Sequence, residues 1–523
     1  MRVLVFHGYL LRGTGSNVYN ASLAQALASL GHEVHLVCQD REAESLPFVD
    51  AVGDWEGRSL AVRTLREPVR ITAYRPDIGG LLPVYVADRY EGFEARPFPA
   101  LSDAELERYL EANVAAVREV VARVRPDIAL ANHAIMGPAI LARALGGAVP
   151  YAVKVHGSAL EYTVRPHSER FAPYAAEGLA GARGVLVGSR HTAEALWQLV
   201  EVPGLQERTR LGPPGVDLDR FRPRPRAQAG RDLAALVERL EGAEAASWGG
   251  EAEAAAALRA LDPGRHRIVA FVGKLIASKG VDLLLAAWPL VVREVPDARL
   301  VVVGFGAYRD GLLRLLGALG AGDLPVAREV ARRGRELEGG PPGELSYLAA
   351  FLDGLESVRR DGYLDAARRA GGTVGFTGRL EHAELADLLP ACEAQVVPST
   401  FPEAFGMVAV EGAACAALPI SAAHSGLAEV TAVLAEAVDE PVRELLSFTP
   451  GPDAVEELAG KLVGWLRLGA GERERAAAAL AAAAHARFGW KGVARGVIAA
   501  ARGELDDLPV PGARPAAVRP ANE

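Results

Sequence analysis

Short apolar runs alternate with longer amphipathic stretches along the chain, and this alternation occurs twice. In the first half it predicts strands at 3–6, 33–38, 128–131, 151–155 and 185–187, with helices such as 17–30, 103–124 and 192–199 between them. In the second half it predicts strands at 267–272, 299–303, 373–376, 395–397 and 418–421. Strands that alternate with helices pair in parallel and build doubly wound sheets. We therefore expect an α/β protein with two Rossmann-like domains.

A segment rich in proline and glycine, 212–225, separates the two halves. The length of 523 residues also exceeds what one ordinary core accommodates. We predict the following organisation: an N-terminal domain at 1–212, a linker with a helical insertion at 213–264 (helical from 226 to 261), a C-terminal domain at 265–487, a helix at 488–505 and a disordered tail at 506–523. Within the second domain, 317–371 is predicted to be a further insertion of two helical pieces joined by a turn, serving assembly or covering a cleft.

Composition excludes some classes of function. The formal net charge of −9 argues against nucleic acid as a partner. Three cysteines lack metal or redox spacing, and no apolar run reaches the length of a membrane span. The pair Asp217 and Asp219 resembles a metal-binding Asp-x-Asp, but it lies in the linker and is better interpreted as a turn. We expect a cytoplasmic protein without a metal site; peripheral membrane contact and the oligomeric state stay open.

Lysine is scarce, because arginine fills most of the 57 basic positions. Lys274 and Lys279 persist on a loop that follows a predicted strand and leads into a helix. An ammonium is a compact point charge that a guanidinium does not replace, so this pair could clamp a diphosphate. The alternative is two solvated surface charges. A neighbouring loop, Gly304-Phe305-Gly306, also follows a strand and is predicted to turn near the same ligand, or to be a turn only.

The segment from Pro398 to Glu411 joins a predicted strand to a helix. Glu403 and Glu411 could accept hydrogen bonds from sugar and ribose hydroxyls. The backbone amides of Phe405, Gly406 and Met407 would face a phosphate at the start of the helix.

In the first domain, Gly13 and Gly15 lie between the first strand and the first helix, where backbone amides can approach a phosphate. Val18 stands where a dinucleotide fingerprint needs a third glycine, so a plain turn fits equally well. His156 and Lys154 lie at the end of a later strand, the edge at which ligands collect in open α/β sheets. A structural histidine is the alternative.

Taken in order, these motifs resemble the family-4 retaining glycosyltransferases, which have the GT-B fold with two domains facing a cleft. The resemblance covers most of the chain outside the two insertions and the tail. The matching stretches are 12–17, 31–34, 155–157, 214–217, 272–280, 301–306, 376–379 and 398–411, with 488–490 resembling the start of a C-terminal helix that crosses back onto the first domain.

The resemblance implies roles for individual residues. Lys274 and Lys279 would bind the donor diphosphate, Glu411 the ribose and Glu403 the sugar, with His156 beside the transferred sugar. Further donor contacts are implied for Gly13, Gly15, Gly273, Gly304, Gly306, Arg379, Phe405, Gly406 and Met407. Acceptor contacts are implied for Arg12, Ser16, Asn17 and Lys154. The first loop departs from the family's paired glycines, and the first lysine is more often arginine in the family.

The implied function is transfer of a sugar from a UDP- or GDP-sugar to an acceptor, with retention of anomeric configuration and without a cofactor. The acceptor could be a sugar, a phosphorylated small molecule or a lipid. An arginine cluster in the first domain favours an anionic acceptor or is a solvated face: Arg58, Arg63, Arg66, Arg70 and Arg75. Two alternatives stay open: a GT-B sugar-nucleotide epimerase, and a non-catalytic nucleotide-sugar-binding protein.

Overall fold

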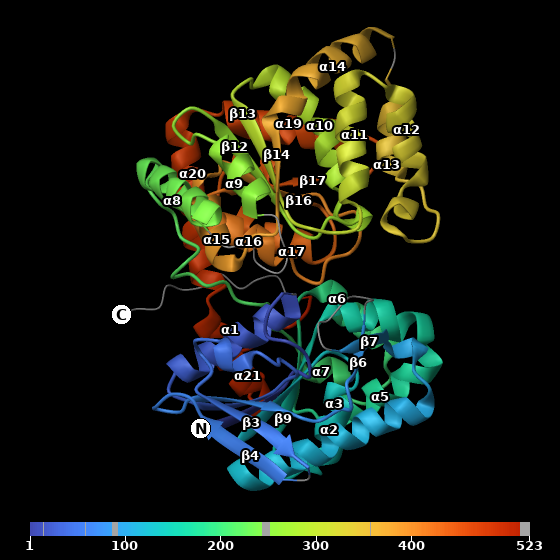
Figure 1. Ribbon diagram of the computed structural model, residues 1–523, viewed down its shortest axis with the longest axis vertical. Coiled ribbons are helices and arrows are strands. Elements are labelled where there is room, and N and C mark those ends of the chain that lie inside the picture. Colours follow the sequence, from blue (N-terminus) through green and yellow to red (C-terminus); the bar gives the residue numbers. More distant parts are fainter. Residues whose placement is uncertain (14, 58, 86–92, 243–250, 356, 513–523) are drawn as a thin grey trace. The chain divides into compact units, whose positions relative to one another are not determined.

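The computed structural model describes residues 1–13, 15–57, 59–85, 93–242, 251–355 and 357–512. The chain divides into two compact units, Met1–Gly215 with Phe488–Glu523, and Val216–Arg487. Each unit contains a largely parallel sheet with helices on both faces (Figure 1). The expected α/β fold class with two doubly wound sheets is confirmed.

The sheet of the first unit follows the order β11-β10-β9-β8-β1-β2-β5-β3-β4. Its strands are β1 (Arg2–Phe6), β2 (Glu33–Val37), β3 (Ala51–Glu56), β4 (Ser59–Thr64), β5 (Ile71–Arg75), β8 (Ile128–Asn132), β9 (Tyr151–Val155), β10 (Gly184–Val187) and β11 (Thr209–Leu211). Neighbouring strands are parallel except β3 and β4, which pair antiparallel. A separate parallel pair joins β6 (Leu81–Val84) to β7 (Glu94–Pro97).

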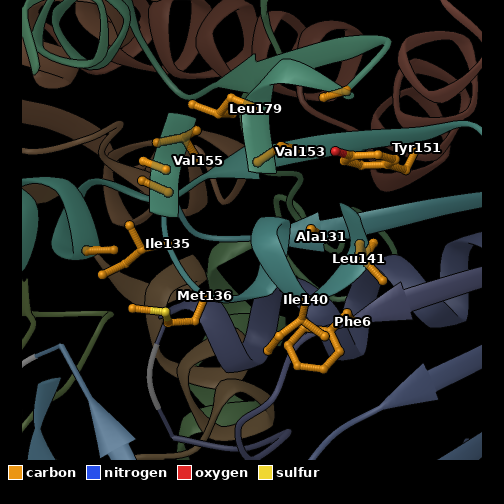
Figure 2. Close-up of a cluster of buried hydrophobic side chains, with 14 of the residues drawn as sticks. Phe6, Ala131, Ile135, Met136, Ile140, Leu141, Tyr151, Val153, Val155 and Leu179 are labelled. Carbon is orange, nitrogen blue, oxygen red and sulfur yellow. The ribbon is translucent and has the colours of Figure 1, made fainter. Parts of the chain in front are cut away.

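Central strand β1 is buried on both faces, as its unbroken apolar run predicts. Leu4 and Phe6 belong to the core on one face, whereas Val3 and Val5 belong to the core on the other. Figure 2 shows the first of these cores, in which Phe6 and Ile140 lie together beneath the strands that carry Ala131 and Val153.

The helices of the first unit are α1 (Gly15–Ser29), α2 (Asp103–Val124), α3 (Gly137–Leu145), α4 (Gly157–Ala159), α5 (Ser168–Ala180), α6 (Arg190–Leu199), α7 (Leu205–Arg208) and α21 (Trp490–Arg502). The expected bounds of α2 are confirmed, because Ser102 and Glu105 form a capping box at its start. Helix α1 begins at Gly15, earlier than the predicted Asn17, so Gly15 and Ser16 lie in its first turn.

Helix α21 packs in the first unit, where Ala494 and Val497 are buried in the same core as β1. The chain that follows it was expected to be disordered from 506 onward. For 506–512 this expectation is wrong: Leu508 packs against that core, and the amide of Leu211 donates to the carbonyl of Pro509 at 2.7 Å. Residues 513–523 lie outside the described residues.

The sheet of the second unit follows the order β14-β13-β12-β15-β16-β17, and all of its pairs are parallel. Its strands are β12 (Arg267–Val272), β13 (Ala298–Val303), β14 (Val374–Gly378), β15 (Ala394–Val397), β16 (Leu418–Ala422) and β17 (Ser447–Phe448). Its helices are α8 (Arg226–Gly242), α9 (Glu251–Arg259), α10 (Val281–Glu294), α11 (Arg309–Ala321), α12 (Leu324–Arg333), α13 (Ser346–Asp353), α14 (Ser357–Ala370), α15 (His382–Leu388), α16 (Met407–Ala414), α17 (Ser425–Ala435), α18 (Val442–Leu445), α19 (Ala454–Arg467) and α20 (Ala470–Arg487). In the described part of the chain, no helix is both long and apolar enough to cross a membrane.

Both predicted insertions belong to the second unit. Helix α9 packs on β14, where a Cβ added to Gly375 would lie 3.2 Å from the Cβ of Ala257. The later segment, 317–371, holds α12, α13 and α14 in addition to the end of α11, which is more than the two helical pieces expected.

The later segment also contributes to the core of the second unit rather than lying only at its edge. Tyr363 of α14 is fully buried and donates a hydrogen bond to the carbonyl of Ala286 in α10 at 2.9 Å. Removal of the segment would therefore uncover α10.

Strand order identifies the edge at which ligands bind. In the first unit the order reverses at β1, which lies between β8 and β2; in the second it reverses at β12, which lies between β13 and β15. Crevices at the carboxyl ends of strands beside such a reversal are the ligand sites of open α/β sheets. The loops after β1 and β8, and those after β12 and β15, are therefore in the positions that ligands use.

Candidate functional site

Three loops of the second unit meet at the carboxyl ends of β12, β13 and β15. The amide of Leu275, in the loop after β12, donates to the carbonyl of Phe305 in the loop after β13 at 2.8 Å. On the other side, the amide of Thr400, in the loop after β15, donates to the carbonyl of Ser278 at 2.9 Å. Backbone hydrogen bonds thus hold the loop with the two lysines between the other two.

Glycine is required where these loops approach one another. Gly280 has a φ of +67°, and a Cβ there would lie 2.0 Å from the carbonyl oxygen of Pro398. Gly304 has a φ of +151°, and a Cβ there would lie 1.8 Å from the carbonyl oxygen of Gly273. Gly306 similarly faces the carbonyl of Leu275. These glycines permit the close packing of the loops, and their contact with a donor stays a prediction.

Lys279 and Glu403 form an ion pair, although they are 124 residues apart in the sequence. Ser399 donates a further hydrogen bond to the same carboxylate oxygen at 2.6 Å. Burial by itself would raise the pKa of Glu403, but the Lys279 ammonium and the two hydrogen bonds outweigh burial and lower this pKa. The site therefore holds an ionised carboxylate beside an ammonium, at the mouth of the parallel sheet.

The loop after β15 leads directly into α16. Gly406 precedes the helix with a φ of +113°, and a Cβ there would collide with Leu427 at 2.6 Å. The amide of Glu403 is held by the Ser425 hydroxyl at 2.8 Å. The loop is thereby fixed so that the amides at Gly406 and Met407 stand at the positive end of the helix dipole, which favours an anion.

Glu411 lies within α16 and is buried, with 3% of the residue exposed. Its Oε1 accepts a hydrogen bond from His382 Nε2 at 3.0 Å. Burial by itself would lower the pKa of His382, but the Glu411 carboxylate outweighs burial and raises it. Sequence reasoning did not single out His382; its position at the start of α15, just after β14, was the available signal.

Lys274 and Arg379 flank the same edge. Lys274 is half-buried and follows Gly273 directly after β12. Arg379 pairs with Glu381 at 2.7 Å, and its guanidinium lies 5.9 Å from the centroid of the Phe305 ring. Phe305 is 48% exposed, which is unusual for a phenylalanine.

In the first unit, His156 follows β9 and belongs to a buried polar network. Its Nε2 lies 2.9 Å from Asn132 Oδ1, so Nε2 carries the hydrogen. Asn132 Nδ2 donates in turn to Asn20 Oδ1 at 2.8 Å and to the carbonyl of Phe6. Burial holds the pKa of His156 well below its usual value, and the ammonium of Lys154 lowers it further, so the imidazole of His156 is neutral.

The network continues from Asn20 to the first loop. Asn20 Nδ2 donates to His7 Nδ1 at 2.9 Å, so the hydrogen of His7 lies on Nε2, which contacts Asn17 Oδ1 at 3.0 Å. Asn17 Nδ2 donates to the carbonyl of Arg12 at 2.6 Å. Burial lowers the pKa of His7 to about 4, which keeps this imidazole neutral as well. The loop that carries Arg12 is thus connected to His156 through side chains from β8 and α1.

Sequence reasoning missed His7, Asn20 and Asn132. His7 and Asn132 are polar residues at the carboxyl ends of apolar strands, the same signal that singled out His156. Applied to every strand, that criterion would have found both. Asn20, inside a helix, had no such signal.

The candidate donor and acceptor residues of the first unit differ in exposure. Gly13, Gly15 and Arg12 are exposed, and Arg12 pairs with Glu42 at 2.6 Å. Lys154 instead is buried, and its ammonium donates to the carbonyl of Gly212 at 2.5 Å. Burial lowers the pKa of Lys154 to about 7. Thr14, between the two glycines, lies outside the described residues.

Two of the five arginines in the predicted cluster pair with carboxylates. Arg75 makes a two-pronged ion pair with Asp54, and Arg63 pairs with Glu44. Arg66 donates to the carbonyl of Leu46, and Arg58 lies outside the described residues. These contacts favour a solvated face over an anion-binding surface at Arg63 and Arg75.

Two further expectations concern metals. Asp217 Oδ1 accepts hydrogen bonds from the amides of Asp219 and Arg220, which is the geometry of a turn. Among the described residues, no three His, Cys, Asp or Glu side chains gather in a group that could hold a metal ion.

Comparison with known families identifies the chain's relatives. A model of glycosyltransferase family 4 matches residues 13–220, and a model of the group 1 glycosyl transferases matches 259–324 and 361–437. The chain belongs to the family-4, group 1 glycosyltransferases. The GT-B fold of this family is confirmed, and the group 1 match is interrupted between residues 324 and 361.

Individual relatives share part of the chain. The D-inositol 3-phosphate glycosyltransferase of Segniliparus rotundus is 29% identical over 295 residues, which cover 56% of this chain and 46% of the relative. A GDP-mannose-dependent α-(1-6)-phosphatidylinositol monomannoside mannosyltransferase of Mycolicibacterium smegmatis is 34% identical over 118 residues, 23% of each chain. The chain matches about half or less of the length of these two relatives.

Solved structures support the fold over nearly the whole chain. Sucrose-phosphate synthase from Thermosynechococcus elongatus gives a TM-score of 0.56 at 19% identity, covering 96% of this chain and 98% of that one. HepE of Anabaena in complex with UDP-glucose gives 0.54 at 16% identity, covering 95% and 98%. At these identities the likeness establishes the fold alone.

Proposed function

We propose that this protein transfers a sugar from a nucleotide-diphosphate-sugar to an acceptor, with retention of anomeric configuration. The observation that carries the proposal is the ion pair of Lys279 with Glu403, held between glycine loops at the strand-order reversal of the second unit. A glycosyl donor presents a doubly charged diphosphate and a hydroxyl-rich sugar. An ammonium and a carboxylate side by side match these two parts.

In this proposal the second unit binds the donor. An ammonium has three N–H donors, and Glu403 accepts one from Lys279, so two can reach phosphate oxygens. Lys274 supplies a second cation, and the amides at the start of α16 supply partial positive charge. Glu403 accepts hydrogen bonds from the sugar, and Glu411 from the ribose. The base is uracil or guanine.

The chemistry follows from where charge develops. As the glycosidic bond breaks, the sugar becomes oxocarbenium-like and negative charge builds on the leaving diphosphate. Lys274 and Lys279 strengthen their interaction with the diphosphate as this charge grows, which stabilises the transition state more than the ground state. The departing phosphate oxygen then accepts the proton of the acceptor hydroxyl. The hydroxyl oxygen therefore bonds to the anomeric carbon on the same face of the sugar that the phosphate leaves, which gives retention.

The first unit binds the acceptor in this proposal. The exposed Arg12 of the first loop donates hydrogen bonds to the acceptor, and Ser16 and Asn17 lie in the first turn of α1 behind it. His156 stands beside the transferred sugar as a neutral hydrogen-bonding group. Relatives named for inositol phosphate and phosphatidylinositol mannoside make a phosphorylated polyol the first acceptor to test.

A matrix of UDP-, GDP- and ADP-sugars tests the proposal, with D-inositol 3-phosphate among the acceptors. Nucleotide release measures turnover, thermal shift measures donor binding, and proton NMR of the product gives the anomeric configuration. We expect release that depends on an acceptor, a retained configuration, and turnover that persists in a chelator. Reversible loss of turnover in the chelator contradicts metal-independent transfer.

The outcomes also separate the alternatives. A changed donor sugar without an acceptor would indicate an epimerase, and tight donor binding without release would indicate a binding protein. Absence of binding to all three nucleotides would refute the donor assignment itself.

A further inference from the structure

The segment that interrupts the group 1 match touches the lysine loop. Glu338 Oε2 accepts a hydrogen bond from the backbone amide of Ala277 at 2.7 Å. Ala277 opens the short helical turn that ends at Lys279, and Ala277 itself is buried. The Glu338 side chain is only 12% exposed, so water competes little for this bond. A residue outside the matched stretches therefore fixes the start of the turn that carries Lys279.

The backbone around Glu338 holds its carboxylate in this position. Glu338 ends a helical turn that begins at Arg335, and the amide of Arg335 donates to the carbonyl of Gly343 at 3.0 Å. Gly334, just before the turn, has a φ of +43°, and a Cβ there would lie 2.0 Å from the carbonyl oxygen of Gly343. The amide of Leu345 returns to the carbonyl of Ala331 at 2.9 Å. This closed backbone leaves Glu338 little freedom to move away.

The contact fixes the lysine loop on a third side. Leu275 and Ser278 already hold the loop to its two neighbours through backbone bonds. The amide of Ala277 lies between these two anchors. Without Glu338, this buried amide would lose its hydrogen-bond acceptor, at a cost comparable to that of a lost hydrogen bond. The loop would then relax at the turn that orients Lys279.

We propose that Glu338 is a positioning residue for the Lys274–Lys279 loop, and that the segment between the two matched stretches serves donor binding. This inference rests on the proposed function, because the loop is the one assigned to the diphosphate. Glu338 acts through the Ala277 amide and does not touch the donor. The other oxygen of its carboxylate pairs with Arg335, whose side chain is 58% exposed. A neutral acceptor of the same shape should therefore keep the bond to Ala277 and lose only an ion pair that solvent screens.

Two variants and a matched control test this. Glu338→Ala removes the acceptor, whereas Glu338→Gln keeps an oxygen at the same position without the charge. Glu336→Ala is the control, because Glu336 lies on the same turn but is exposed and pairs with Arg333 at 3.1 Å. UDP, GDP and ADP are the probes in calorimetric titration, and hydrogen–deuterium exchange follows the peptide that contains Ala277.

We expect Glu338→Ala to weaken binding of the preferred nucleotide by about tenfold, with Glu338→Gln and Glu336→Ala within about threefold of the wild type. We also expect faster exchange at 273–280 in Glu338→Ala alone, at unchanged global unfolding. Unaltered exchange and affinity in Glu338→Ala would overturn the proposal, as would a Gln variant as impaired as the Ala variant. If no nucleotide binds the wild type, the proposed function fails, and exchange alone decides whether Glu338 positions the loop.

Discussion

Lys279→Ala removes the ammonium that pairs with Glu403 and that we assign to the donor diphosphate. After the substitution, Glu403 keeps its hydrogen bond from Ser399 but loses its charged partner. The diphosphate loses a contact that strengthens as its charge grows. We therefore expect kcat to fall more than donor affinity, since the lost interaction is strongest in the transition state.

The structure sets the magnitude of this effect. The side chains of Lys279 and Glu403 are 30% and 22% exposed, so solvent screens the charges only in part. Loss of such a preorganised charged contact costs about 3 kcal/mol, or about a hundredfold in kcat. Donor affinity should weaken by less than about tenfold. A double-mutant cycle of Lys279→Ala with Glu403→Gln, measured on the activation free energy from kcat, should give a coupling energy of about 1 to 2 kcal/mol.

Steady-state kinetics with a saturating donor, calorimetric donor binding and thermal unfolding provide the assay. Lys274→Arg is the milder companion, because it keeps a cation at the neighbouring position. The pH profile adds a second readout: without Lys279, burial raises the pKa of Glu403, so the acid limb of activity should move to higher pH. A folded Lys279→Ala protein with near-normal kcat would refute the site assignment and most of the mechanism built on it.

Three further changes have defined outcomes. Gly304→Ala should destabilise the second unit by about 2 to 3 kcal/mol and abolish donor binding, because its Cβ would lie 1.8 Å from the carbonyl oxygen of Gly273. Chemical denaturation measures the stability and calorimetric titration the donor binding; a denaturation midpoint equal to that of the wild type would contradict the steric argument. Asn132→Ala should lower kcat by about tenfold at unchanged donor affinity, because His156 loses the acceptor of its Nε2–H. Equal steady-state kinetics in the variant and the wild type would show that the orientation of the His156 ring does not matter for turnover. Lys154 has a pKa of about 7 in the folded protein and 10.5 in the unfolded chain, so between these pH values the unfolded chain binds one more proton and stability rises with pH. Between pH 7 and 9 the free energy of unfolding of the wild type should rise by up to about 1.4 kcal/mol per pH unit relative to that of Lys154→Met. Unfolding free energies of the two proteins that change in parallel with pH would refute the lowered pKa.

Many elements of this fold can be predicted from short stretches of the sequence. Unbroken apolar runs such as Val3 to Phe6 are typical of strands buried on both faces, and their alternation with helices favours parallel sheets. The start of α2 follows from its capping box. The glycine loops and the two lysines after β12 were recognisable because strand, loop and helix signals are contiguous in the chain. These features depend on backbone geometry over a few residues.

The partners of the site residues were decided only by tertiary structure. Glu403 lies 124 residues from Lys279, and Glu338 lies 61 residues from Ala277. Strand order brings such loops together, and strand order depends on how whole sheets pack rather than on any local pattern. The burial of Lys154 was likewise invisible, because a lysine at a strand end has the same local signature whether its ammonium meets solvent or a carbonyl oxygen. Local sterics thus determined the elements, and long-range packing determined which side chains meet.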